Sequence, residues 1–209
     1  MVSSPEGQFQ EALEKTRWIS DLYKTYLKPP ILNRTIYSLG CGDGLELLHL
    51  REFCGPQARM VAIEKSPYYT TIPIAVYTNT KFFQADIRNV QRYVVTQPPG
   101  LIISRAPRII EGVNEAGDII TINEWWFDTL GQWARALPEH GQMLITTLHP
   151  VEHRLLAEAL KQQGLSFISS KFSGYNRKLE IKYGPLVAAP DKQVLYYCAP
   201  EVPLQVGNN

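Results

Sequence analysis

Glycines and acidic residues stand at the ends of three apolar runs, and their types and spacing indicate a ligand site. The run Thr35-Ile36-Tyr37-Ser38-Leu39 leads directly into Gly40-Cys41-Gly42-Asp43-Gly44, and a helical pattern follows. Glycines let the backbone turn tightly and let a ligand approach the main chain without meeting a Cβ. Glu64 and Asp86 each end a further apolar run. Because the carboxyl ends of parallel strands meet at one edge of a sheet, these features predict one binding site there.

The spacing of the glycines restricts the ligand class. A dinucleotide fingerprint would need a third glycine where this chain has Leu45, and no Walker-type lysine follows the turn. Glu64 can accept two hydrogen bonds from a ribose diol, at about 1.5–3 kcal/mol each. Asp86 can accept one from an adenine amino group, with Ile87 packed on the ring. A plain tight turn and helix-capping acids would explain each residue singly, but the joint pattern favours a nucleoside-like ligand.

Length and composition set the broad class. The chain has 209 residues, 44% of them hydrophobic, which suits one domain with a sizeable core. A net charge of +1 argues against a dedicated duplex-binding protein. Three cysteines without a Cys-x-x-Cys pair predict neither a disulfide framework nor a zinc site, so we expect no bound metal. With no secretory signal pattern and no apolar run of spanning length, we expect a cytoplasmic protein that does not interact with membranes.

Alternating patterns predict an α/β fold. A leading helix starts at Ser4-Pro5-Glu6 and stops at Lys28-Pro29-Pro30. Five strand–helix repeats follow, with strands at 35–39, 60–64, 81–85, 101–104 and 142–148 and helices at 45–53, 67–74, 90–94, 122–137 and 151–163. Strands are expected at 167–172 and 194–198 as a closing antiparallel pair, with a loop or an irregular hairpin between them at 174–191. We expect one domain at 1–209, with a helical extension (1–30), a β-α core (31–165) and the closing strands (166–200).

With these motifs, the chain resembles the class I S-adenosylmethionine-dependent methyltransferases. Leu39 to Gly44 is similar to their first motif, Glu64 matches their ribose-binding acid, and Asp86-Ile87 matches their adenine-binding position. The resemblance implies a Rossmann-like single domain with strand order 3-2-1-4-5-7-6, strand 7 antiparallel and helices on both faces. It also implies S-adenosyl-L-methionine as cofactor, S-adenosyl-L-homocysteine as product and an enzyme of the EC 2.1.1 class.

The same resemblance names the cofactor contacts residue by residue. They are Ser38, Gly40, Cys41, Gly42, Glu64, Lys65, Asp86, Ile87 and Ser104. Ser38 is a departure, because the family usually has an acid two residues before the first glycine. That acid helps to orient the methionine portion, so the serine predicts a weaker hold on that end of the cofactor.

The acceptor is expected beyond strands four and five. Arg105 and Arg108 can hold an acceptor carboxylate or phosphate, or can be solvated loop residues. His149 is the candidate base or, alternatively, a helix-capping or structural histidine. Trp125 can wall an apolar acceptor pocket or pack in the core. The Tyr23 face of the leading helix can close over the cofactor as a lid or pack on the sheet.

Several functions remain open from sequence. Neutral overall charge favours methyl transfer to a small-molecule acceptor. An RNA or protein methyltransferase would need a basic surface built from residues such as Arg105, Arg108, Arg177, Lys178 and Lys182. An aminopropyl transferase would need an acid after strand four, where Arg105 stands instead. A non-catalytic S-adenosylmethionine binder or partner subunit is the remaining alternative, and the oligomeric state is undetermined.

Overall fold

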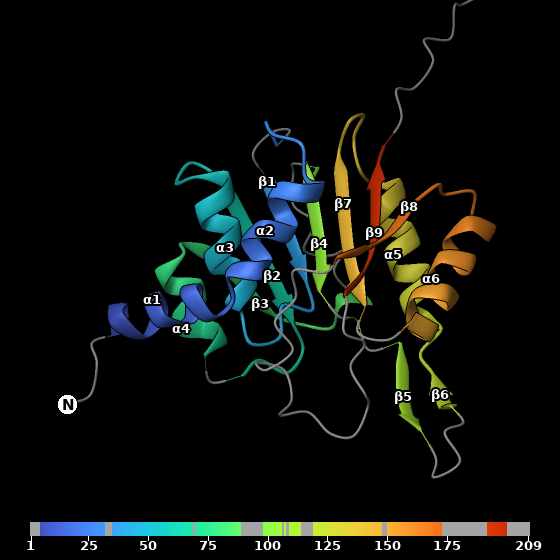
Figure 1. Ribbon diagram of the computed structural model, residues 1–209, viewed down its shortest axis with the longest axis horizontal. Coiled ribbons are helices and arrows are strands. Elements are labelled where there is room, and N and C mark those ends of the chain that lie inside the picture. The colour runs from blue at the N-terminus through green and yellow to red at the C-terminus, as the bar shows by residue number, and fades with distance from the viewer. Residues whose placement is uncertain are drawn as a thin grey trace, which may run out of the picture.

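A seven-stranded sheet forms the centre of the molecule, with helices on both faces (Figure 1). The computed structural model describes residues 5–31, 35–68, 70–88, 98–105, 107, 109–113, 119–147, 150–172 and 192–199. The strand order is β3-β2-β1-β4-β7-β9-β8. The strands are β1 (Thr35–Leu39), β2 (Arg59–Glu64), β3 (Thr80–Gln84), β4 (Leu101–Arg105), β7 (Gln142–Thr147), β8 (Ile168–Phe172) and β9 (Lys192–Cys198).

Strand direction follows the expected pattern. From β3 to β7 each neighbouring pair is parallel, whereas β9 is antiparallel to both β7 and β8. Every residue of β1 and of β7 is buried, as expected for parallel strands covered on both faces. The predicted order 3-2-1-4-5-7-6 with an antiparallel seventh strand is therefore confirmed.

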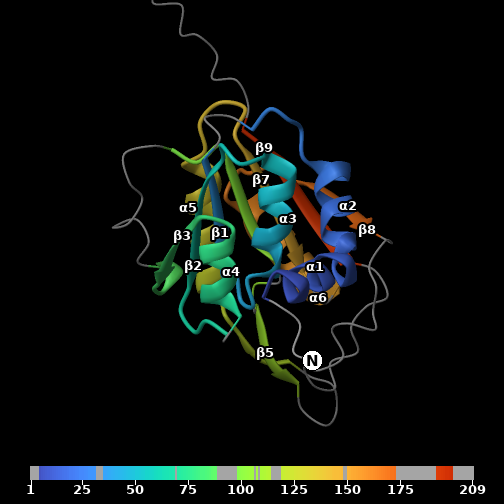
Figure 2. The same cartoon turned by 90° about the vertical axis from the view of Figure 1, so that its left-hand side faces the viewer.

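The helices divide between the two faces. On one face lie α1 (Pro5–Lys15), α2 (Arg17–Tyr26), α3 (Leu45–Cys54) and α4 (Thr71–Tyr77), which face the viewer in Figure 2. On the other lie α5 (Trp125–Arg135) and α6 (Pro150–Gln162). The two apolar clusters between the sheet and these layers make up the core, so the carboxyl ends of the parallel strands sit at a rigid edge.

Helix α2 is fixed to the sheet and is not a lid. Tyr23 is 1% exposed and packs in the core. Beyond the helix, the main chain of Lys28 exchanges two hydrogen bonds with the side chain of Gln142, at 2.8 and 2.7 Å. The Tyr26 hydroxyl lies 2.6 Å from the Ser170 hydroxyl on β8. Two roles were considered for the leading helix, a lid over the cofactor and packing on the sheet, and these contacts support packing.

Two predicted helices have different bounds. The leading helix is interrupted at Thr16, which separates α1 from α2. The helix expected at 67–74 begins instead at Thr71. Pro73 gives the reason, because proline is tolerated in the first turn, where N–H groups lack helical partners, but would break a helix begun four residues earlier.

A short hairpin was not predicted. Strands β5 (Ile110–Val113) and β6 (Ile119–Ile122) pair antiparallel and lie beyond the carboxyl-end edge of the main sheet (Figure 1). The prediction of a helix from residue 122 was wrong at its start, since Ile122 ends β6 and α5 begins at Trp125. The expected helix at 90–94 and loop at 174–191 lie outside the described residues.

Candidate functional site

The glycine turn adopts a backbone that other residues rarely take. Gly40, Gly42 and Gly44 have φ angles of +68°, +53° and +78°. A Cβ on Gly44 would lie 3.3 Å from Thr71 Cα, so this position combines the left-handed conformation with close packing on α4. Gly40 N donates to Ile63 O at 2.8 Å, which joins the turn to β2. Strand β2 on one side and helix α4 on the other thus hold the turn in one conformation.

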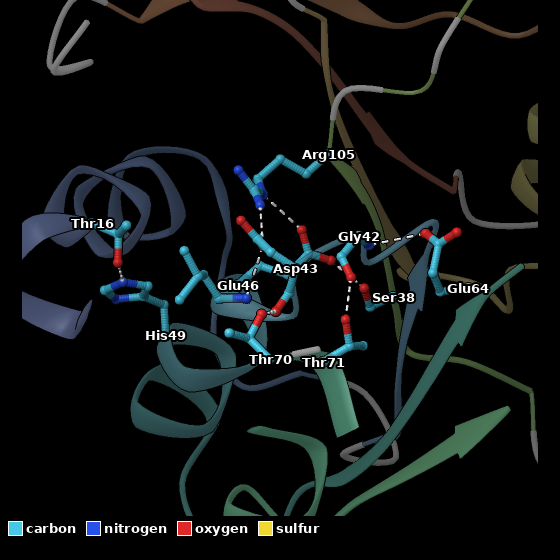
Figure 3. A network of polar contacts seen from close by, with 11 residues as sticks. Thr16, Ser38, Gly42, Asp43, Glu46, His49, Glu64, Thr70, Thr71 and Arg105 are labelled. Atoms are coloured by element: carbon cyan, nitrogen blue, oxygen red, sulfur yellow. Dashed lines mark hydrogen bonds and ion pairs between the residues drawn. The ribbon is translucent and has the colours of Figure 1, made fainter. Parts of the chain in front are cut away.

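Helix α4 supports the turn through two threonines that the sequence did not single out. Thr70 Oγ1 donates to the carbonyl of Asp43 at 3.0 Å, and Thr71 Oγ1 donates to the carbonyl of Gly42 (Figure 3). A Cβ on Gly42 would lie 3.8 Å from the ring of Tyr68, which leads into α4. A helix was expected to begin at residue 67, whereas α4 begins at Thr71. The contacts of this segment with the glycine turn were therefore not predicted from the sequence.

Glu64 lies beside the turn as predicted. Its Oε2 accepts from Gly42 N at 2.9 Å and its Oε1 from Ser66 N at 2.9 Å. A carboxylate has about four lone-pair sites. With one backbone donor on each oxygen, both oxygens retain a site that can accept a hydroxyl. The geometry therefore fits a residue that holds the turn and a diol at the same time.

Asp86 lies in a cluster of charges at the end of β3. Arg88 donates to both of its carboxylate oxygens, and Lys65 Nζ lies 3.7 Å away. Hydrogen bonds from Arg88 lower the pKa of Asp86 to about 2. The Arg88 guanidinium also lies 5.0 Å from the ring centroid of Trp125. The structure thus brings Trp125, assigned to the acceptor from sequence, towards the Asp86 side of the edge.

The second tryptophan reaches the glycine turn. Trp126 stacks on Trp125 with centroids 4.6 Å apart and is 6% exposed. A Cβ on Gly40 would lie 3.5 Å from Trp126 Cη2. Ile87 is buried in the same core cluster. The two indoles and Ile87 therefore belong to one apolar cluster, which reaches the turn at Gly40.

A buried ionic network lies behind the turn. Ser38 is fully buried and donates to Glu46 of α3. Arg105, at the end of β4, donates from Nε to Glu46 Oε2 at 2.9 Å and from its terminal nitrogen to Asp43 Oδ1 at 2.9 Å (Figure 3). Ser104 donates to the carbonyl of Leu39 at 3.2 Å. These bonds join β1, α3 and β4 directly under the glycine turn.

Glu46 is a further residue of the candidate site that was not predicted from the sequence. An acid in the first turn of a helix ordinarily faces solvent, where it favours the helix dipole. Glu46 instead has 0% exposure, and burial raises its pKa to about 7 against the opposing effect of Arg105. The sequence does contain one indication that Glu46 is buried, because it stands in the otherwise apolar run Leu45 to Leu48.

Cys41 has no features of a reactive thiol. It is 1% exposed, and burial together with Glu46 and Glu64 raises its pKa well above the ordinary value. Its main-chain N–H points to Ile63 O at 3.3 Å. Cys41 therefore contributes its backbone and volume to the turn.

Two candidate residues, Arg108 and His149, lie outside the described residues. Within the described ranges, no group of His, Cys, Asp and Glu is arranged to hold a metal ion. The helices of the described part include none long and apolar enough to cross a membrane.

A depression of about 460 Å³ lies at the opposite edge of the sheet, between Pro56 and Lys81, away from the residues above.

Comparisons with known proteins agree on the fold. No family model and no curated protein sequence matches the chain. Among solved structures, a putative rRNA methylase from Clostridium thermocellum superposes with a TM-score of 0.58 at 14% identity, over 95% of this chain and 99% of that one. A putative methyltransferase from Haloferax volcanii, solved with the activator Trm112, gives 0.59 at 14% identity, over 94% and 96%.

A third structure contains a ligand. Fibrillarin from Aeropyrum pernix, in complex with natively bound S-adenosyl-L-methionine, superposes with a TM-score of 0.57 at 15% identity, over 87% of this chain and 74% of that one. At these identities the similarity establishes the fold. The chain has the Rossmann-like fold of the class I S-adenosylmethionine-dependent methyltransferases.

Proposed function

We propose that this protein is an S-adenosylmethionine-dependent methyltransferase that acts on a small-molecule acceptor. One observation carries the proposal: the glycine turn, Glu64 and Asp86 stand at the ends of the adjacent strands β1, β2 and β3. In open α/β sheets, ligands bind beyond the carboxyl ends of the strands where the strand order reverses, and here the order reverses between β1 and β4.

The residues present fit the cofactor. Glu64 keeps lone pairs for a ribose diol while holding Gly42 N. The positive φ angles of Gly40 and Gly42 give the tight turn that places this main chain beside Glu64. At the adenine end we assign Asp86 and Ile87, with Lys65 beside them. Ser38, Cys41 and Ser104 are buried and act by shaping the turn and the end of β4.

In methyl transfer, the protein mainly positions the methyl donor and the acceptor. Bound S-adenosylmethionine would supply an electrophilic methyl group with a good leaving group. The chain has to hold the donor and the acceptor in line and to keep water out, and orientation of this kind contributes about 7–11 kcal/mol. The fixed turn and the anchored helix α2 provide a rigid frame for that task. We assign the role of base to His149, where it would act if the acceptor must lose a proton.

The proposed class of methyl acceptor depends on the charged residues at the carboxyl ends of the strands. An RNA substrate calls for basic residues at the carboxyl-end edge. Of those considered from sequence, the structure describes Arg105, which is ion-paired with both Asp43 and Glu46. This pairing supports a small acceptor over a polyanion, with Arg108 and the wall formed by Trp125 as its proposed contacts. RNA remains the second candidate because the structural neighbours include a putative rRNA methylase.

Calorimetry tests the cofactor assignment. The purified protein should bind S-adenosylmethionine and S-adenosylhomocysteine with measurable heat, and Glu64→Ala should weaken both about ten-fold or more, since a diol loses charged hydrogen bonds. Lys81→Ala, at the opposite edge of the sheet, is the matched control. Absence of binding at millimolar cofactor by a folded protein would refute the proposal.

Turnover separates an enzyme from a non-catalytic binder. Methyl-labelled cofactor is incubated with small-molecule and RNA fractions of a cell extract, and labelled products are identified by mass. Label in a small molecule supports the proposal, label in RNA supports the second candidate, and binding without label in any fraction indicates a binder or partner subunit. Gly42→Arg, which fills the turn, serves as the inactive control.

A further inference from the structure

The depression at the amino-terminal edge of the sheet has a cationic lining. It has a volume of about 460 Å³ and lies where β2 and β3 begin, between the chain segments 56–60 and 79–81. Among the described residues that line it, Arg59 and Lys81 are charged, both are cations, and none is acidic. Gln57 and Asn79 add two amide groups. Sites for small ligands have volumes of about 300–1,000 Å³, so the depression has the size of a ligand site and the charge to attract an anion.

Strand pairing brings the two cations to the same face of the sheet. Lys81 is opposite Val61, which comes two residues after Arg59 on β2, and residues two apart in a strand share a face. Their Cα atoms are therefore about 8 Å apart, from one strand spacing across and two residues along the strand. Both residues are exposed, and Lys81 Nζ lies 4.9 Å from the ring centroid of Phe83 on the same face. Two cations at this spacing repel each other, and an anion that contacts both removes the repulsion.

Arg51 of α3 holds the two loops that bound the depression. Its guanidinium donates hydrogen bonds of 2.7–3.1 Å to five main-chain carbonyls, which are those of Gly55, Pro56, Ala58, Thr78 and Asn79. Arg51 is not among the lining residues, so these oxygens are turned away from the depression, where they would repel an anion. The bonds also tie the loop before β2 to the loop before β3, and the depression therefore keeps its shape without a ligand.

The same arginine balances the helix dipoles at this edge. Helices α3 and α4 both end beside the depression, at Cys54 and Tyr77. The carboxyl end of a helix carries about half a negative charge, so two such ends amount to about one negative charge. The Arg51 guanidinium supplies one positive charge at the same carbonyls. Arg59 and Lys81 therefore add their charges to loops whose dipoles are already neutralised.

We propose that this depression binds an oligophosphate, with Arg59 and Lys81 as the charged contacts and the amides of Gln57 and Asn79 as hydrogen-bond partners. A guanidinium donates two parallel bonds to one phosphate, and a lysine acts as a point charge on another. The described lining includes no aromatic ring on which a base could stack, so the phosphates are the recognised part of the ligand. The inference goes beyond the proposed function, because this edge of the sheet is opposite to the edge that holds Glu64.

Titration calorimetry of the full chain with sodium tripolyphosphate, at an ionic strength of about 0.15 M, tests the site. The double variant Arg59→Gln/Lys81→Gln removes both cations and keeps polar side chains at both positions. Arg154→Gln/Lys161→Gln is the matched control, because it removes one arginine and one lysine from exposed positions on α6, outside the depression. All four residues are exposed, so both double variants should keep the wild-type melting temperature.

The expected result is a loss confined to the depression. Arg59→Gln and Lys81→Gln alone should each weaken tripolyphosphate about three-fold to ten-fold, between the values for an exposed ion pair and for a charged hydrogen bond. The double variant should lose measurable binding, and the α6 control should bind like wild type. Two further ligands identify the source of the phosphates. Preference for uridine triphosphate over an oligouridylate supports a free nucleotide or polyphosphate, whereas tighter binding of the oligouridylate supports the same contacts to an RNA backbone.

Three results would overturn the inference. They are absence of tripolyphosphate binding by the folded wild-type protein, undiminished binding by Arg59→Gln/Lys81→Gln, and an equal loss in the α6 control. The last result would mean that the anion responds to net charge alone. The proposed function is tested separately, because S-adenosylmethionine carries no phosphate and its affinity should be unchanged in Arg59→Gln/Lys81→Gln. Failure of tripolyphosphate to bind therefore leaves the cofactor assignment standing, and failure of S-adenosylmethionine to bind leaves this inference standing.

Discussion

Two buried ionisable side chains on α3 should act in opposite directions on stability as pH changes. Burial raises the pKa of Glu46 from 4.5 to about 7 and lowers the pKa of His49 from 6.5 to about 4. Between pH 4.5 and 7, the folded state holds a proton on Glu46 that the unfolded state has lost, so stability falls as pH rises. Between pH 4 and 6.5, the unfolded state holds a proton on His49 that the folded state lacks, so stability rises with pH.

The magnitudes nearly cancel where the windows overlap. Each group shifts by about 2.5 pH units, which corresponds to at most about 3 kcal/mol across its own window. From pH 4.5 to 6.5 the two slopes are equal and opposite, so their joint contribution to the free energy of unfolding is flat. Between pH 6.5 and 7 only Glu46 contributes, and the free energy of unfolding falls as pH rises. Between pH 4 and 4.5 only His49 contributes, and the free energy of unfolding rises with pH.

Urea denaturation of three proteins from pH 4 to 7.5 measures this directly. Glu46→Gln keeps one acceptor oxygen, which can take the bond from Arg105 while its amide NH2 donates to the Ser38 hydroxyl. His49→Gln places an amide near the His49 Nε2 position that lies 2.7 Å from Thr16 Oγ1. Relative to wild type, Glu46→Gln should gain stability as pH rises from 4.5 to 7, and His49→Gln should lose it as pH rises from 4 to 6.5. Subtraction at each pH removes the contribution of all other groups.

Parallel curves for wild type and Glu46→Gln would refute the argument for Glu46, because they would mean that Arg105 and Ser38 offset its burial completely. Parallel curves for His49→Gln would show that its ring is solvated in the folded state. A slope of the wrong sign in either variant would contradict the assignment of its buried protonation state.

Three further predictions concern the frame of the site. Arg51 donates five hydrogen bonds to carbonyl oxygens of neighbouring loops, so Arg51→Met should lower the free energy of unfolding by about 2–4 kcal/mol in urea, and a loss below about 1 kcal/mol would contradict a joint role for these bonds. Gly44→Ala should cost about 1–3 kcal/mol because of its positive φ and close packing, measured by the same method; Gly55→Ala, which shares a positive φ but has open space around it, is the control that isolates the packing contribution. Iodoacetamide under native conditions should label exposed Cys198 long before buried Cys41, and equal labelling rates by mass spectrometry would show that the turn opens freely.

The main sheet was predictable from sequence because its signals are local. Runs of apolar residues, each followed by glycine or an acid, predicted the positions of β1 and β2 correctly. The strand order came from the resemblance in motifs at Gly40, Glu64 and Asp86, and the structure confirms it. Such features depend on a few adjacent residues, so one sequence is sufficient.

The network behind the turn was not predictable for a physical reason. Arg105 comes 59 positions after Glu46 in the chain. Arg105, Glu46 and Ser38 each have an ordinary local explanation as a loop cation, a helix acid and a strand residue. Their pairing depends on how α3 and β4 pack across β1. The hairpin of β5 and β6 was missed similarly, since its strands are four residues each and give too short an alternation to separate from a helix start.

Strand β9 occupies an inner place in the sheet although it is the last described element of the chain. Strand β8, which is synthesised first, reaches the sheet only through β9. The two strands are separated by 20 positions, from Phe172 to Lys192, which a ribosome takes on the order of 1–4 s to add at about 5–20 residues per second. During that interval the outer edge of β7 has no partner, and an open strand edge is a template for pairing with other chains. Assembly of this sheet on the ribosome therefore includes a period of seconds in which the nascent chain is exposed to misassociation.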